Sequence, residues 1–182
     1  INDKFSDYYA EFKAKPFAEN LTIKNLAQME SGLDWDEDYK NPFRPNAKAY
    51  YGKSLIDATF KRRFKEKPGE KFEYQSGSTQ LLGFAVKKAI NQTLSSYLSE
   101  KFWIPLGMEQ NAIWSTDQSS MEKTYCCIHA SSRDFAKLGQ LFLNDGKYDG
   151  QQLLSVDFIN DMRNPTKKSN EIYGMGFWIN ND

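Results

Sequence analysis

One helix-length apolar pattern constrains the fold of this chain more than any other feature of its sequence. Apolar side chains recur at helical spacing between residues 81 and 89, and the pattern ends near Asn91. This spacing predicts a helix with a buried face, which other elements must cover. The segment Ser76-Gly77-Ser78 directly precedes the pattern, and Tyr74 lies just before that segment. We therefore expect Tyr74 at the entrance to a buried helix.

Further segments carry the residues that start and stop helices. Most begin after a Ser or Thr that can act as an N-cap, and Gly, Asn or Pro follows their ends. The predicted helices cover residues 21–29, 54–65, 93–102, 135–143 and 156–163, with Thr22, Thr93, Ser131 and Ser155 as caps. Asp134 follows Ser131 by three residues, which is typical of a capping box. The chain is therefore expected to be mainly α.

Two stretches depart from the helical pattern. Residues 33–51 are rich in Asp, Asn, Pro and aromatic side chains without a steady period, which predicts a long irregular excursion. Ordered loops of this kind often border functional sites. Residues 172–179 alternate as a strand does, so we expect the start of a sheet there.

Composition and charge exclude several classes of function. Lys plus Arg and Asp plus Glu both number 24, so the net charge is zero and no long-range field attracts nucleic acid. The apolar runs are far shorter than the roughly 20 residues that a membrane span requires. Hydrophobic residues make up 40% of the chain, which is enough apolar surface to fold. We expect a folded chain with no nucleic-acid partner and no membrane span.

The cysteine and histidine content argues against a metal site. Cys126 and Cys127 are adjacent, and neighbouring cysteines rarely form a disulfide, so we expect two buried small residues. His129 is the one histidine, and the ligand spacings of a zinc site are absent. We expect no metal and no cofactor. His129 precedes a helix cap, and at such a position a histidine more often makes a structural hydrogen bond than takes part in catalysis.

Short motifs follow one another in a fixed order along nearly the whole chain. They are Ser31-Gly32-Leu33, Pro68-Gly69 with Phe72-Glu73-Tyr74-Gln75-Ser76, Pro105-Leu106-Gly107-Met108, Ala130 to Gly139, Asn144-Asp145-Gly146 and Tyr173-Gly174-Met175-Gly176-Phe177. In this order they resemble the serine β-lactamase and penicillin-binding-protein family. That family includes class C β-lactamases, D-alanyl-D-alanine carboxypeptidases, esterases and 6-aminohexanoate-oligomer hydrolases. Two features look closest to the branch of 6-aminohexanoate-oligomer hydrolases and related esterases. They are Ser76 in place of the usual Asn and Cys126-Cys127 before the helix that contains Asp134.

The resemblance implies a fold and an incomplete domain. Residues 1–182 would form the helical subdomain of the α/β β-lactamase and transpeptidase-like fold, with a helical region over roughly 1–165 and the start of the sheet region over 166–182. The family's Ser-x-x-Lys motif would precede Ile1, and its Lys-Thr-Gly or His-x-Gly strand would follow Asp182. We therefore expect missing N- and C-terminal segments of the same protein as partners. Ser120-Met121-Glu122-Lys123 spells Ser-x-x-Lys, but it lies in a polar stretch and is interpreted as a chance match.

The resemblance also assigns a role to Tyr74. It implies that this tyrosine lies beside the nucleophilic serine and a lysine, and that the three relay a proton during acyl transfer. A neighbouring ammonium favours the phenolate and lowers a pKa that is about 10 in the free side chain, so that the tyrosine can act as a base. Without the resemblance, a tyrosine packed at a helix entrance with its hydroxyl bonded to backbone would be the commoner case.

Ser76 has two open interpretations, as a substrate-binding residue or as the start of the helix cap. A Ser hydroxyl is shorter than an Asn amide and reaches less far toward a substrate amide, which argues against β-lactam hydrolysis. The aromatic residues of the excursion likewise either wall a substrate pocket or cover the core. They are Trp35, Tyr39, Phe43, Tyr50 and Tyr51. Trp103, Trp114 and Trp178 are expected in the core or at an interface.

Two functions from different classes follow. The first is part of a serine acyl hydrolase that acts through an acyl-enzyme on an amide, ester or β-lactam of a small-molecule or peptide substrate. In that case this chain alone is expected to be inactive. The second is a non-catalytic relative that binds peptidoglycan peptides or a protein. The resemblance alone suggests a periplasmic or cell-envelope location.

Overall fold

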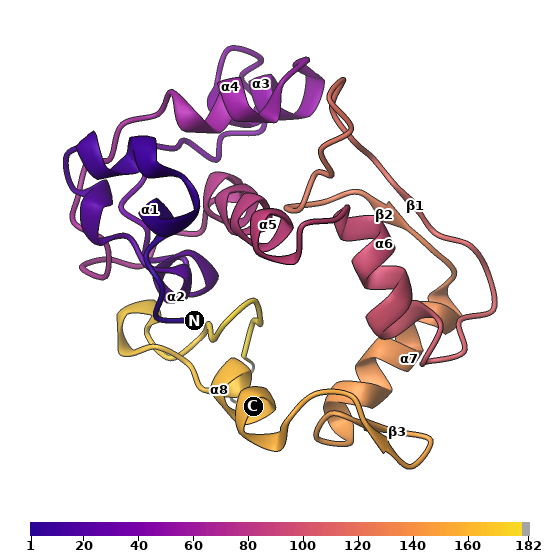
Figure 1. The fold of residues 1–182 in the computed structure, drawn as a ribbon. Coiled ribbons are helices and arrows are strands. Elements are labelled where there is room, and N and C mark those ends of the chain that lie inside the picture. Colours follow the sequence, from indigo (N-terminus) through magenta and orange to yellow (C-terminus); the bar gives the residue numbers. More distant parts are fainter. Residues whose placement is uncertain (180–182) are drawn as a thin grey trace.

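Helices alternate with irregular segments through residues 1–179, the part of the chain that the computed structural model describes (Figure 1). The α-helices are α1 (Phe5–Tyr8), α2 (Ile23–Ala27), α3 (Pro45–Tyr51), α4 (Leu55–Phe60), α5 (Ser76–Ile90), α6 (Leu94–Leu98), α7 (Ser132–Leu143) and α8 (Val156–Arg163). Short 3-10 turns cover Ala10–Ala14, Ala18–Asn20 and Lys167–Ser169, and a π-helical turn covers Ser99–Trp103. The prediction of a mainly α fold is confirmed.

The strands of residues 1–179 are short and form two separate two-stranded ribbons. Strand β1 (Ile113–Trp114) pairs antiparallel with β2 (Ile128–His129), with Ile113 opposite His129. Strand β3 (Lys147–Tyr148) pairs antiparallel with β4 (Gln151–Gln152), with Lys147 opposite Gln152. These two ribbons join helices rather than form a layer.

The helices are arranged around α5 (Figure 1). The N-terminal helices α1 to α4 lie on one side of α5, and α6 and α7 continue away on the other. The chain then returns through α8, so that its last described segment lies beside the N-terminal segment. An ion pair between Lys168 Nζ and Glu30 Oε2, at 3.5 Å, links the two segments. Residues far apart in sequence therefore meet beside the start of α5.

An aromatic cluster fixes α5 against the N-terminal helices. The Phe12 ring lies 4.6 Å from that of Phe5 and 5.0 Å from that of Phe60, between ring centroids. Phe60 in turn lies 5.1 Å from Phe84 of α5. The three pairs are edge-to-face, the arrangement in which the positive ring edge meets the negative ring face. Phe5, Phe12, Phe84 and Leu81 are buried, and the partly buried Phe60 packs against them, which makes α5 the central helix.

The predicted helix caps are confirmed. Each hydroxyl accepts a hydrogen bond from the backbone N–H three residues later, in Thr22, Thr93, Ser131 and Ser155. The ends of two helices were predicted too late, since α2 ends at Ala27 and α4 at Phe60. After α4 the chain instead runs against residues 32–34, because Lys65 donates its backbone N–H to the Gly32 carbonyl at 2.9 Å.

Two irregular regions differ from their predictions. The excursion over residues 33–51 ends in α3, where Pro45 occupies the first turn and needs no hydrogen-bond partner for its nitrogen. Residues 172–179 do not form one continuous strand. The chain turns at Gly176, whose φ is +79°, and an isolated antiparallel bridge pairs Tyr173 with Trp178. A helical region ending near residue 165 and a sheet region after it remain a prediction, and residues 180–182 lie outside the described residues.

The expectation of two unpaired, buried cysteines was wrong. Cys126 and Cys127 are joined by a disulfide and are only half-buried. The pair lies in a bend in which Cys127 takes a positive φ of 77°. Adjacent cysteines can be bridged here because the backbone turns between them instead of extending.

Asp134 is fully buried at the start of α7. Its carboxylate accepts hydrogen bonds from the backbone N–H of Glu109 at 2.7 Å and from the Ser131 hydroxyl at 2.7 Å. The Glu109 bond, followed by the Ser131 bond, holds the pKa of the Asp134 carboxyl below its ordinary value. This carboxylate therefore fastens the loop before β1 to α7, the structural role that its capping position predicts.

We predict that Asp134→Asn lowers the melting temperature at pH 7 by several degrees, because the charged acceptor is lost. A depressed pKa contributes stability above the unfolded-state pKa and loses it as pH falls through the folded-state value. The gap between wild type and variant should therefore close on acidification, measured by thermal melts of the full-length protein from pH 7 to pH 3. Asp157→Asn, on the first turn of α8, is the control, and a gap independent of pH would refute the linkage.

Candidate active site

A buried glutamine positions the start of α5. Gln75 is 1% exposed, and its Nε2 donates to the backbone carbonyls of Leu33 at 2.9 Å and Trp35 at 3.3 Å. The hydroxyls of Ser31 and Ser78 lie 3.4 and 3.3 Å from its Oε1 and 2.8 Å from each other, so one hydroxyl donates to the other, which donates to Oε1. One side chain thus joins the segment after α2 to the first turn of α5. Its two neighbours in sequence, Tyr74 and Ser76, are held in place as a result.

Glu37 holds Ser76 from the irregular excursion. The Ser76 backbone N–H donates to Glu37 Oε2 at 3.0 Å, and its hydroxyl donates to Oε1. Trp35 Nε1 and the Tyr39 hydroxyl donate to the same carboxylate at 2.7 and 2.6 Å. Ser76 is the first residue of α5, preceded by Gln75 as N-cap, so the cap interpretation of Ser76 is wrong by one position.

Tyr74 lies at the surface, and its hydroxyl makes no hydrogen bond within residues 1–179. Its side chain is 40% exposed, and its ring lies 5.2 Å from Trp178 and 6.0 Å from Tyr173, between centroids. Among residues 1–179 its hydroxyl has no hydrogen-bond partner, in contrast to a tyrosine bonded to backbone at a helix entrance. Trp178, expected in the core or at an interface, is 58% exposed and contributes to the aromatic surroundings of Tyr74.

Tyr74 borders an apolar cavity of about 460 Å³, which we call the apolar cavity. It lies between α2, α5, α8 and the last described segment. Its apolar lining residues include Ile23, Leu26, Leu82, Val86, Phe158, Met162 and Met175. Tyr173 also lines it, and burial raises the pKa of this phenol to about 12, so Tyr173 stays protonated near neutral pH. A reacting group beside Tyr74 would therefore be surrounded by apolar side chains.

Ser76 borders a different cavity, of about 320 Å³, which we call the tyrosine pocket. Its lining residues are Tyr39, Asn46, Ala47, Tyr50, Tyr51, Ser76, Tyr125 and Cys126. Tyr125 lines both cavities and separates them. The two predicted site residues therefore lie two positions apart on the chain but face two adjoining cavities. Three of the aromatic residues proposed as a pocket wall line the tyrosine pocket, namely Tyr39, Tyr50 and Tyr51. Trp35 is buried in the core, and Phe43 lines neither cavity.

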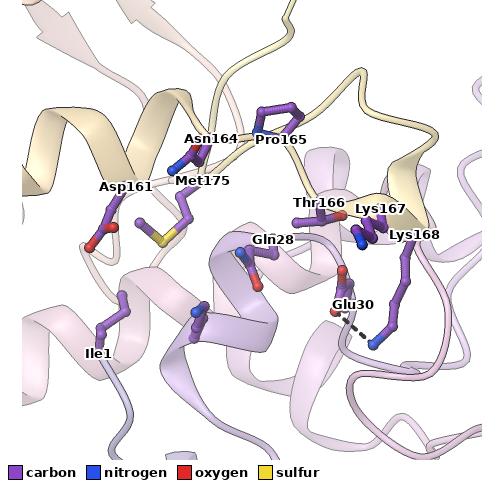
Figure 2. Close-up of a pocket in the computed structure, with 11 residues that line it drawn as sticks. Ile1, Gln28, Glu30, Asp161, Asn164, Pro165, Thr166, Lys167, Lys168 and Met175 are labelled. Atoms are coloured by element: carbon purple, nitrogen blue, oxygen red, sulfur yellow. Dashed lines mark ion pairs between the residues drawn. The ribbon is translucent and has the colours of Figure 1, made fainter.

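A third cavity, of about 360 Å³, lies between α2 and the segment that follows α8 (Figure 2). Figure 2 shows Gln28 and Glu30 on one side and Asn164 to Lys168 on the other, with the Glu30–Lys168 ion pair at one edge. Tyr74 and Ser76 do not line this cavity. The residues around it connect the segment after α2 to the segment after α8 and do not contribute to the candidate site.

The remaining candidates lie elsewhere. His129 is exposed on β2, and the structural hydrogen bond expected of its side chain is not present among the described residues. Residues 120–123 are not helical, and Lys123 Nζ donates to the Tyr50 carbonyl at 2.7 Å. Within residues 1–179, no group of three His, Cys, Asp or Glu side chains could hold a metal ion. No helix in this part of the chain is long and apolar enough to cross a membrane.

Comparisons with known proteins give one consistent result. The family model described as Beta-lactamase matches residues 1–182. A putative 6-aminohexanoate-dimer hydrolase from Bacillus anthracis is 26% identical with a TM-score of 0.87, covering 100% of this chain and 53% of that chain. A putative beta-lactamase from Bacteroides dorei DSM 17855 is 17% identical with a TM-score of 0.77, covering 97% and 57%, a likeness of fold alone.

The curated relatives are much longer than the part they share. Protein flp of Staphylococcus aureus (strain NCTC 8325 / PS 47) is 26% identical over 122 residues, which is 66% of this chain and 24% of that protein. The chain therefore spans about a quarter of the length of the curated relatives it matches, and about half of the similar solved structures.

We predict that Gln75→Leu lowers the free energy of unfolding by about 1–3 kcal/mol, since it removes the buried hydrogen bonds of this amide and leaves the Trp35 carbonyl without its donor. The Leu33 carbonyl keeps the Trp35 N–H, and the Ser31 and Ser78 hydroxyls keep the bond between them. Urea denaturation of the full-length protein measures this change. Gln140→Leu, at an exposed position on α7, is the matched control and should change stability by about 0.5 kcal/mol or less. Equal stability of wild type and Gln75→Leu would show that the network does not hold the start of α5.

Proposed function

Because the chain belongs to the Beta-lactamase family of serine hydrolases, which includes penicillin-binding-protein relatives, we propose that it is part of a serine acyl hydrolase in which Tyr74 transfers protons. The reaction would pass through an acyl-enzyme on an amide, ester or β-lactam. Tyr74 would act first as general base and then as general acid. The activity would belong to the longer protein of which this chain is a part.

The observation that carries this proposal is the free phenol of Tyr74 at the edge of the apolar cavity. Its hydroxyl has no partner among the described residues, and its ring is held by Trp178 and Tyr173. A general base must reach the proton that it removes, at about 2.6–3.2 Å between heavy atoms. A positioned but unbonded phenol meets this requirement once a nucleophile occupies the space beside it.

The proton transfers follow from this position. A serine oxygen attacks the carbonyl carbon of the substrate, and its proton passes to the Tyr74 phenolate. Tyr74 then returns the proton to the nitrogen or oxygen of the leaving group, and water releases the acyl group by the same route in reverse. A lysine ammonium beside Tyr74 would favour the phenolate.

The serine and its lysine are expected from residues outside this chain. Within the helices of residues 1–179, no serine is followed by a lysine three or four residues later, the spacing that places two side chains on one helix face. The apolar cavity supports this arrangement, because Leu82 and Val86 of α5 line it together with Ile23 and Leu26. An apolar element that carried the nucleophile would bury these side chains.

Ser76 is proposed to contact substrate from the tyrosine pocket. Glu37 fixes its backbone and its hydroxyl, which leaves a small, rigid polar group at the cavity wall. The Bacillus anthracis relative is named for hydrolysis of a 6-aminohexanoate dimer, and its 26% identity favours a linear amide or ester over a β-lactam for this chain's parent.

We predict that Tyr74→Phe in the full-length protein lowers kcat/KM for a p-nitrophenyl ester by about 10²–10⁴-fold, the usual contribution of one acid–base group. Steady-state kinetics measures the loss. Tyr148→Phe on β3, which lines neither cavity, is the control and should retain wild-type turnover. Full turnover by Tyr74→Phe would refute the role of Tyr74, and no turnover by wild type would favour the non-catalytic binding function.

A further inference from the structure

The disulfide between Cys126 and Cys127 lies in a short segment that is fixed at both ends. On one side, Thr124 is held against α5, because its hydroxyl donates to the Thr79 carbonyl at 2.9 Å. On the other side, the Cys127 carbonyl accepts a hydrogen bond from the Ser115 N–H at 3.0 Å, where β2 begins beside β1. We therefore expect a change at the disulfide to stay within the residues between these two points.

This short segment forms part of the wall of the candidate site. Cys126 lines the tyrosine pocket together with Ser76, and Tyr125 lines both that pocket and the apolar cavity. Both cysteines are partly exposed. A soluble thiol would therefore meet the disulfide at the wall of the pocket.

The backbone at Cys127 has a conformation that residues other than glycine seldom adopt. Its φ is +77°, in the left-handed region, where the Cβ atom crowds a neighbouring carbonyl oxygen. The ring that the disulfide closes with Cys126 restrains the backbone of both residues. Once the two sulfur atoms separate, this restraint is lost, and we expect Cys127 to return more often to a negative φ. Such a rotation would move the part of the pocket wall that Cys126 provides.

The disulfide contributes little to the stability of the fold. A disulfide stabilises a protein mainly by restricting its unfolded chain, and the effect grows with the length of the loop that the bond closes. Cys126 and Cys127 are adjacent, so they close the shortest possible loop. Exposed disulfides are also the more labile ones, which serve in regulation or catalysis. The pair can therefore be reduced while the fold persists.

We propose that the Cys126–Cys127 disulfide is a reversible redox site that controls the shape of the tyrosine pocket. The oxidised form keeps the pocket wall in place, and the reduced form loosens it. The effect of this change on turnover rests on the proposed function, because Ser76 would contact substrate from the same pocket.

The reductant is a dithiol, and the exchange proceeds in two steps. A thiolate of the dithiol attacks one sulfur atom and forms a mixed disulfide, and the other cysteine leaves as a thiolate that takes up a proton. The second thiol of the dithiol then displaces the first cysteine. The dithiol becomes a cyclic disulfide, and Cys126 and Cys127 together receive two electrons and two protons.

Reduction under native conditions tests the site without any turnover. The full-length protein would be treated with dithiothreitol, its thiols alkylated with iodoacetamide, and the modified residues mapped by mass spectrometry. Alkylation of Cys126 and Cys127 is expected, with a melting temperature lowered by about 5 °C or less. Amide hydrogen exchange is expected to become faster over residues 125–129 and to stay unchanged over α5. Thiols that appear only as the whole protein unfolds, or unchanged exchange after reduction, would overturn the proposal.

Two double variants connect the bend with the pocket. The variant with Cys126→Ser and Cys127→Ser has no disulfide, so it should behave as the reduced protein and ignore dithiothreitol. In both, KM for the p-nitrophenyl ester is expected to rise by about 2- to 10-fold, the effect of one lost contact. The variant with Cys126→Ser and Cys127→Gly also lacks the disulfide, but glycine adopts a positive φ readily, so it should recover part of this loss.

The outcomes separate the redox site from the proposed function. An equal response of wild type and the double serine variant to dithiothreitol would overturn the proposal, as would an unchanged KM of the reduced wild type. If the wild type shows no turnover at all, the hydrolase function fails. Alkylation and hydrogen exchange then still decide whether the redox site exists.

Discussion

The side chain of Gln75 is the constraint on which the candidate site depends. It is buried between the segment after α2 and the first turn of α5, and it bonds to two backbone carbonyls and to the hydrogen-bonded hydroxyl pair of Ser31 and Ser78. A buried amide with all its bonds made can occupy only one orientation. The backbone is extended at Gln75, so the side chains of its two neighbours point away from the Gln75 side chain. Tyr74 borders the apolar cavity, and Ser76, in the first turn of α5, borders the tyrosine pocket.

This arrangement gives the two cavities separate tasks. The apolar cavity brings Tyr74 to a place where proton transfer can occur, and its apolar lining suits an element that carries a nucleophile. The tyrosine pocket offers a fixed polar group, Ser76 held by Glu37, that suits the recognition of a substrate arm. Tyr125 lies between the two cavities and lines both of them.

Local features of the fold could be predicted from the sequence because their causes are local. The caps of α2, α6, α7 and α8 depend on a hydroxyl and an N–H three residues apart, and the order of motifs resembled the family that residues 1–182 match. Tyr74 was proposed from the same motifs, and its catalytic role stays a prediction. The end of α4 and the turn at residues 172–179 were not, since contacts with distant segments override local periodicity there.

The supporting residues of the site were missed for a related reason. Glu37 and Asn46 lie in the irregular excursion, and each reaches its partners through the folded chain. The family motif singled out Tyr74 and Ser76, but no sequence feature indicated a role for Gln75 between them. The Cys126–Cys127 disulfide depends on a backbone bend that no sequence pattern predicted.

The most direct test of the central claim is the location of a covalent adduct. The full-length protein would be labelled with a fluorophosphonate, the modified serine mapped by mass spectrometry, and the adduct's crystal structure determined. The account predicts phosphonate on a serine outside residues 1–182, with Tyr74 Oη within about 3.2 Å of that serine's oxygen. An adduct on a serine of this chain, or a Tyr74 phenol directed away from the adduct, would contradict it.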